Sequence, residues 1–174
     1  MNVLIGLLRA VNVGGTGKLP MEDLKAICRE IGFSDPQTYI ASGNLVFGTA
    51  LDPRAAKAAL EVGLEAYAGK PVGVLVRTPE EMQAVLNANP FPDGPGNRVL
   101  VTFLDDAPPS DTLERVTHQK EEKVALGKRE IYVHYGDGMG QSKLKIPAAR
   151  YGTARNMNTI ARLVDMAAAR GESN

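Results

Sequence analysis

The chain has 174 residues, of which 44% are hydrophobic and 23% are charged, and its formal net charge is zero. Such values are typical of a soluble globular protein with one domain or two small units, and they argue against a duplex-DNA binder with a basic stripe. One cysteine and two histidines provide too few thiolate and imidazole ligands for a zinc site, so we expect no metal. We also expect no cofactor.

An apolar run at residues 3–10 predicts a buried strand at the start of the chain. Pro20 suits the first turn of the helix that follows, and Gly32 suits its end. Hydrophobic residues recur at helical spacing in this segment and include Cys28, so we expect that thiol to be buried and slow to react. The chain starts without a basic leader and contains no apolar run of about 18 residues, so we expect a cytoplasmic protein without a membrane span.

Residues 37–48 predict two short strands around a Ser-Gly-Asn turn, in which Gly43 and Asn44 would supply the positive φ values of a tight hairpin. A second helix begins at Pro53, and residues 71–77 predict the next strand. The order up to this point is β-α-β-β-α-β, which is the ferredoxin-like split βαβ pattern.

The second half of the chain predicts a similar order of elements. The sequence Thr-Pro-Glu-Glu at residues 78–81 is a capping box that opens a short helix. The elements predicted after it are a strand at 98–104, a helix at 111–119, a hairpin at 123–135 and a helix at 155–169. We therefore expect an α+β fold of two ferredoxin-like (β-α-β-β-α) units with antiparallel sheets, at residues 1–78 and 79–174, the second lacking its last strand and packing on the first.

The first candidate site is the glycine-rich run "RAVNVGGTGKLP" at residues 9–20. A phosphate-binding P-loop has the pattern G-x-x-x-x-G-K-[ST], but here Asn12 takes the place of the first glycine and Leu19 that of the hydroxyl residue. The run is therefore not the loop of a nucleotide triphosphatase. Its glycine amides, with Arg9 and Lys18 on either side, leave open a role in anion binding or a purely structural one.

A second glycine-rich loop, "YGDGMGQSKLK" at residues 135–145, follows a predicted strand and contains Ser142 and Lys143. Three glycines in eleven residues are consistent with a wide structural turn. They also expose backbone amides beside two lysines, which leaves contact with an anion as the alternative.

The third candidate site is the start of the last helix, where either Thr153 or Asn156 can serve as the N-cap. Arg155 and Asn158 add further polar groups to the same turn. Because a helix N-terminus attracts anions, this segment is either a ligand contact or a set of polar bonds within the fold.

Four stretches of the chain together resemble the bacterial family catalogued as domain of unknown function 1697: "LLRAVNVGGTGKLPMEDL", "TYIASGNLVF", "NPFP" and "YGDGMGQSKL…TARNMNTIARL". The resemblance spans essentially the whole chain and implies a soluble bacterial protein with an α+β fold of ferredoxin-like units. By position, the polar signature of the family falls on Arg9, Asn12, Gly14, Gly15, Ser42, Gly43, Asn44, Ser142, Lys143, Thr153, Arg155, Asn156 and Asn158.

The chain departs from the usual pattern of the family at three positions. Ala10 stands where a glycine is common, Gln141 where an arginine is common, and Met157 where a tryptophan is common. The loss of that arginine and that aromatic ring weakens the case for stacking a nucleic-acid base here.

The function that these features favour is binding of a small anionic or phosphorylated ligand in a polar cleft between the glycine-rich loops. The residues expected to contact the ligand are Arg9, Asn12, Gly14, Gly15, Lys18, Ser42, Asn44, Ser142, Lys143, Arg155, Asn156 and Asn158. A metal-independent enzyme that uses the same cleft and a nucleic-acid-binding module remain as alternatives, and no pattern in the sequence identifies a catalytic residue.

Overall fold

The computed structural model describes residues 1–9 and 18–172, and the contacts of the chain divide it into two units. The first unit contains Met1–Met82 and Arg162–Asn174, and the second contains Gln83–Ala161. The sequence places the boundary after residue 78 and the whole last helix in the second unit. In the structure, most of that helix belongs to the first unit instead.

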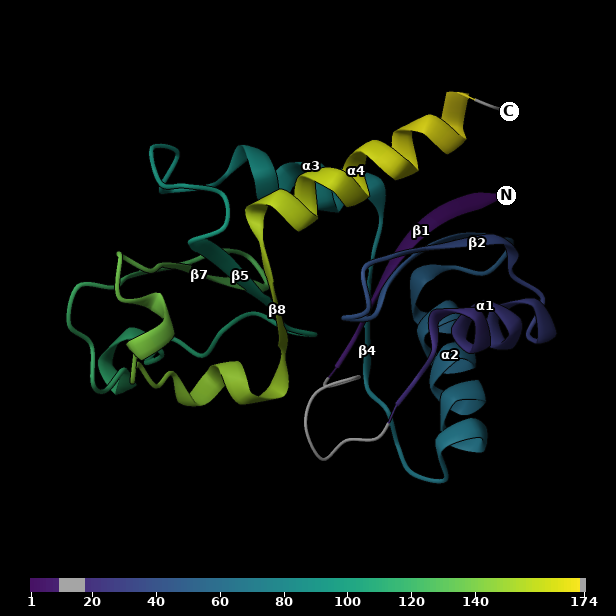
Figure 1. Cartoon of the computed structure of the whole chain (residues 1–174), viewed down its shortest axis with the longest axis horizontal. Coiled ribbons are helices and arrows are strands. Elements are labelled where there is room, and N and C mark those ends of the chain that lie inside the picture. Colours follow the sequence, from purple (N-terminus) through teal and green to yellow (C-terminus); the bar gives the residue numbers. More distant parts are fainter. Residues whose placement is uncertain (10–17, 173–174) are drawn as a thin grey trace. The chain divides into compact units, whose positions relative to one another are not determined.

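The first unit contains a four-stranded antiparallel sheet with the strand order β2-β3-β1-β4. Its elements, in chain order, are β1 (Asn2–Leu8), α1 (Met21–Glu30), β2 (Ser34–Tyr39), β3 (Asn44–Thr49), α2 (Pro53–Ala68) and β4 (Val74–Arg77). Figure 1 shows α1 and α2 packed on the same side of this sheet. All six elements occur in the predicted order.

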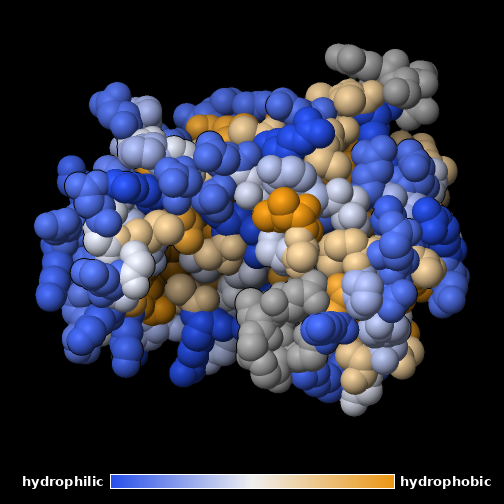
Figure 2. Space-filling model, viewed as in Figure 1, coloured by the Kyte–Doolittle hydropathy of each residue, from blue (hydrophilic) through white to orange (hydrophobic). Residues whose placement is uncertain are grey.

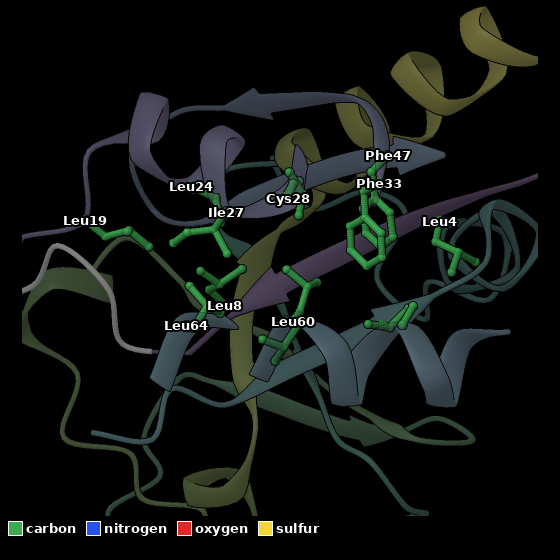
Figure 3. Packing of buried hydrophobic residues seen from close by; sticks show 14 residues of the cluster. Leu4, Leu8, Leu19, Leu24, Ile27, Cys28, Phe33, Phe47, Leu60 and Leu64 are labelled. Carbon is green, nitrogen blue, oxygen red and sulfur yellow. The ribbon is translucent and has the colours of Figure 1, made fainter. Parts of the chain in front are cut away.

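The core of the first unit lies between this sheet and its two helices. Leu24, Ile27 and Cys28 of α1 point towards the strands, as the helical spacing predicts (Figure 3). The rings of Phe33 and Phe47 stack with their centroids 4.2 Å apart. Burial raises the pKa of the Cys28 thiol to about 12, so the group is neutral at physiological pH.

The turn between β2 and β3 is built differently from the predicted hairpin. The positive φ angles belong to Ile40 (51°) and Gly43 (87°), whereas Asn44 is already the first residue of β3. The side-chain amide of Asn44 is buried and donates hydrogen bonds to the carbonyl of Tyr39 (3.0 Å) and the hydroxyl of Ser42 (2.9 Å). These bonds close the turn and allow it to be longer than a two-residue loop.

Side-chain caps fix the starts of α2 and α3 (Pro79–Asn87). The carboxylate of Asp52 accepts a hydrogen bond from the backbone N–H of Ala55 (2.8 Å). At α3, the hydroxyl of Thr78 accepts from the N–H of Glu81 (3.1 Å), and the Glu81 carboxylate accepts from the N–H of Thr78 (2.9 Å). These reciprocal bonds confirm the predicted capping box.

The second unit has its own four-stranded antiparallel sheet, with the order β6-β7-β5-β8. The strands are β5 (Val99–Phe103), β6 (Lys123–Leu126), β7 (Glu130–His134) and β8 (Thr153–Asn156), and α4 (Met157–Glu172) follows. The predicted strand and hairpin are confirmed. The sequence indicates that the last strand is missing, but β8 completes this sheet.

Two helix predictions in this half of the chain differ from the structure. Only the 3₁₀ turn Leu113–Arg115 forms within residues 111–119, because Thr117 exchanges backbone hydrogen bonds with Lys145 (3.0 and 2.9 Å) and His118 has a φ of 60°. The last helix begins two residues later than predicted, since Arg155 belongs to β8 and Asn156 provides the cap by accepting from the N–H of Thr159 (2.9 Å).

Hydrophilic side chains cover most of the face drawn in Figure 2, and hydrophobic ones show there in small groups. Within residues 1–9 and 18–172, no helix is both long enough and apolar enough to cross a membrane.

Candidate functional site

One end of the second sheet brings together two of the predicted polar segments. His134 lies opposite Val99, and Asn156 lies opposite Leu100, so β7 and β8 both end where β5 begins. The glycine-rich loop after β7 and the start of α4 therefore leave the sheet at the same end, on the two sides of β5 (Figure 1).

A third segment, residues 94–98, joins these two. The carbonyl of Arg98 accepts a hydrogen bond from the N–H of Tyr135 (2.8 Å), and the Arg98 guanidinium forms an ion pair with Asp137. The carbonyl of Gly96 accepts from the N–H of Met157 (3.0 Å), at the first residue of α4. The segment thus holds both the glycine-rich loop and the helix start in place.

Gly96 also lies in close contact with the side chain of Asn158. A Cβ atom at this position would collide with the side-chain amide of Asn158. The predicted site residue Asn158 therefore packs directly on the backbone of residues 94–98.

A pocket of about 220 Å³ lies beside the glycine-rich loop. Its lining includes Lys120, Glu122, Tyr135, Gly138, Ser142 and Lys143. Ser142 and Lys143, which the sequence predicts at a ligand site, both line this pocket. The volume suits a small molecule or ion rather than a large cofactor.

Glu122 anchors this pocket. One carboxylate oxygen accepts a hydrogen bond from the hydroxyl of Ser142 (2.6 Å), and the other accepts from the backbone N–H of Lys120 (2.6 Å). The Ser142 bond, followed by the backbone bonds, holds the pKa of Glu122 below its ordinary value. Burial and the nearby Glu122 charge raise the pKa of Tyr135, so its phenol stays protonated.

The backbone of the loop carries unused hydrogen-bond donors. Within the described part of the chain, the N–H groups of residues 136–140 make no hydrogen bond. Successive backbone amides in a turn can hold an anion, and Gly136, Gly138 and Met139 line the pocket together with Lys120 and Lys143. The arrangement is chemically suited to holding an anionic group.

Arg155 lies in β8, opposite Val101, and only 7% of it is exposed. Its guanidinium donates to the hydroxyl of Thr153 (2.7 Å) and to the carbonyl of Ala154 (3.0 Å). Burial lowers its pKa to about 10. The structure therefore places this arginine within the sheet and not in the first turn of a helix, where the sequence puts it.

The other predicted site residues belong to the first unit. Arg9 follows β1, with its N–H donating to the carbonyl of Gly73 (2.9 Å), and Lys18 is exposed just before α1. Ser42 and Asn44 bond to each other in the β2–β3 turn. Asn12, Gly14 and Gly15 lie outside the described residues. The expected meeting of the loop at residues 9–18 with the other two segments stays a prediction.

Sequence reasoning missed the contributions of Glu122, Lys120 and Arg98. Glu122 contacts a residue twenty positions away, and nothing in its local pattern distinguishes it from a solvated charge at the start of a hairpin. For the segment that contains Arg98, the sequence offered one local signal. The run "GPG" at residues 94–96 indicates a loop with an unusual backbone requirement.

Comparison with known proteins places the chain in a family. A model described as "Protein of unknown function (DUF1697)" matches residues 1–132. Among solved structures, the conserved bacterial protein SP0830 from Streptococcus pneumoniae is similar, with a TM-score of 0.79 and 23% sequence identity, over 95% of this chain and 98% of that one. At this identity the likeness concerns the fold. No curated protein matched.

Proposed function

The chain belongs to the DUF1697 family of proteins of unknown function, and we propose that its second unit binds a small anionic or phosphorylated ligand beside residues 136–143. The observation that carries this proposal is the run of five backbone N–H groups, at residues 136–140, without hydrogen bonds inside the described chain. Three of these residues, Gly136, Gly138 and Met139, line the pocket, so their backbone lies where a bound anion would be contacted.

The pocket beside these amides is lined by two lysines, Lys120 and Lys143, and by two carboxylates, Glu121 and Glu122, and the Glu121 carboxylate lies near Gly136. Both oxygens of the Glu122 carboxylate are occupied by Ser142 and by the Lys120 backbone, so this carboxylate holds the loop and does not face the ligand. Lys143 and Lys120 are both exposed, and both line the pocket. Two ammonium groups and several amides are the donors that a phosphate or carboxylate group requires.

The same proposal covers the fold family of the two units, the cellular location of the protein and binding without a metal. The strand order β2-β3-β1-β4, repeated as β6-β7-β5-β8, favours assigning both units to the ferredoxin-like arrangement. A cytoplasmic protein is consistent with a single buried cysteine. We propose metal-independent binding, since the described residues contain no group of three His, Cys, Asp or Glu side chains placed to hold a metal ion.

A thermal-shift screen with inorganic phosphate, sugar phosphates and mononucleotides tests the proposal. A ligand at one hundred times its dissociation constant stabilises the folded state by about 2.7 kcal/mol. For a chain of this length that corresponds to a rise in Tm of about 5–11 °C. We expect at least one phosphorylated compound to produce such a rise.

The matched variants are Lys143→Ala and Lys145→Ala. Both remove one exposed lysine from the same segment, but only Lys143 lines the pocket. Lys143→Ala should remove most of the ligand-induced shift, and Lys145→Ala should preserve it. A screen without any stabilising anion, or an equal loss in both variants, would contradict the proposal.

A further inference from the structure

The first unit contains a polar cavity of about 830 Å³ that follows strand β2. Its charged lining residues come from three elements: Lys25 and Arg29 from α1, Asp35 from β2, and Arg162, Asp165 and Arg170 from α4. The volume is within the range of small-molecule sites, and the cavity is open to solvent along one side. Neither the family nor the function proposed above accounts for this cavity.

The α1 wall presents two cations. Lys25 and Arg29 are four residues apart, so their side chains lie on the same side of the helix. Lys25 pairs with Glu22, which lies outside the lining, at 2.8 Å. Arg29 is exposed and forms no ion pair among the described residues, although the pKa of Glu22 is lowered by Lys25 and, to a smaller extent, by the charge of Arg29.

The α4 wall is fixed to the sheet by one arginine. The Arg170 guanidinium donates to the carbonyls of Ser34 (3.0 Å) and Asp35, and it lies 3.5 Å from the Asp35 carboxylate. The charges of Arg170 and Asp35 therefore offset each other. Arg162, two turns earlier on the same helix, lies over the ring of Tyr39 at 6.0 Å from its centroid and is exposed.

The two walls lie on opposite faces of the sheet. Phe47 packs in the core with α1, so the next residue, Gly48, faces the other side. A Cβ atom at Gly48 would lie 3.3 Å from the guanidinium of Arg170, which places α4 on that second face. A cavity lined by both helices therefore wraps around the free edge of β2.

The edge itself is unsuited to pairing with another strand. β2 is the outer strand of its sheet, but Pro36 has no N–H to donate, Asp35 has a φ of 43°, and the register shifts between Ser34 and Gln37. Such irregularities block the addition of an extended peptide. The occupant must use the side chains on both sides of the edge.

The lining of the cavity has a net positive charge when the pair between Arg170 and Asp35 is set aside. Arg170 and Asp35 offset each other, which leaves Arg29 and Arg162 on the two sides of the edge and a single carboxylate, Asp165, in the lining. We propose that this cavity binds a compact polyphosphate, free or as part of a nucleotide, with phosphate groups reaching both Arg29 and Arg162. Guanidinium groups on opposite walls match a ligand whose negative charges are several bonds apart.

Isothermal titration calorimetry with sodium tripolyphosphate tests this site, with the Lys143→Ala protein as the starting variant so that the pocket of the second unit contributes little. We expect saturable binding. Adding Arg29→Ala and Arg162→Ala should raise the Kd by about tenfold or more, because each charge-assisted contact is lost. Adding Arg54→Ala and Lys128→Ala, which remove two exposed cations outside the lining, should leave the Kd within about twofold.

Absence of saturable binding, or equal weakening by the two pairs of substitutions, would overturn the proposal. Circular dichroism confirms that each variant is folded, which the exposure of all four side chains favours. A second titration with ATP identifies the source of the ligand. Tighter binding of ATP than of tripolyphosphate would assign the cavity to nucleotides, and the reverse order would assign it to free polyphosphate. Because the starting variant lacks Lys143, failure of the function proposed for the second unit would leave this result unaffected.

Discussion

Replacement of Tyr132 by phenylalanine should destabilise the second unit, because its hydroxyl caps the end of α3. The backbone N–H of Asn89 donates to the carbonyl of Leu86 (3.3 Å) and not to that of Val85. The Val85 carbonyl instead accepts a hydrogen bond from the Tyr132 hydroxyl at 2.8 Å. Tyr132 is 1% exposed and Val85 is 5% exposed, so water does not replace this bond.

The expected loss of unfolding free energy follows from the burial of this hydrogen bond. Phenylalanine keeps the ring and its packing, so the loss is confined to one hydrogen bond and to a buried carbonyl left without its donor. Such a change costs about 1–3 kcal/mol. For a chain of this size, each kcal/mol lowers Tm by about 2–4 °C.

Urea unfolding followed by far-ultraviolet circular dichroism measures the effect, because the chain has no tryptophan to report by fluorescence. Tyr67→Phe is the matched control. Its hydroxyl donates to the carboxylate of Asp23 at 2.7 Å, but the side chain is 47% exposed and water can take over that bond. Equal unfolding free energies for Tyr132→Phe and the wild-type protein would refute the assignment of Tyr132 as a helix cap.

Three further outcomes are expected. Thr78→Ala should lower stability by about 0.5–2 kcal/mol in the same urea assay, since it removes the hydroxyl that accepts the first N–H bond of α3; no change would argue against the capping box. Cys28 should react slowly with a thiol reagent in the folded protein and rapidly in urea, because burial raises its pKa to about 12; rapid labelling of the folded chain would contradict that burial. The pKa of Glu122 is held below its ordinary value of 4.5, so its stabilising contribution is complete above that value and is lost as the pH falls through the lower pKa of the folded state. Glu122→Gln should therefore flatten the acid limb of the stability curve, and an unchanged limb would show that this carboxylate does not anchor the loop.

The sequence predicted the helices and strands in which buried residues recur at a regular spacing. The helical spacing of Leu24, Ile27 and Cys28 identified both α1 and its buried face. Cap residues such as Thr78 marked helix starts, because a capping box is a bond between near neighbours. These features depend on residues within one or two turns of each other, and a single sequence contains that information.

Features decided by distant contacts escaped prediction. Thr117 could not form a helix because its backbone pairs with Lys145, and Arg155 entered a strand because β5 offered an unpaired edge. The pocket depends on Glu122 and Ser142, which meet only after the second sheet has formed. Polar composition indicated the glycine-rich loop as a candidate site, but it could not show which polar groups hold the loop and which remain available.

The most direct test of anion binding in the second unit is an NMR titration of the ¹⁵N-labelled protein with inorganic phosphate. Binding at the loop predicts saturable chemical-shift changes centred on the backbone amides of residues 136–140, all following one dissociation constant and weakened by Lys143→Ala. Amides at 136–140 that do not shift, while the protein takes up phosphate elsewhere or not at all, would contradict it.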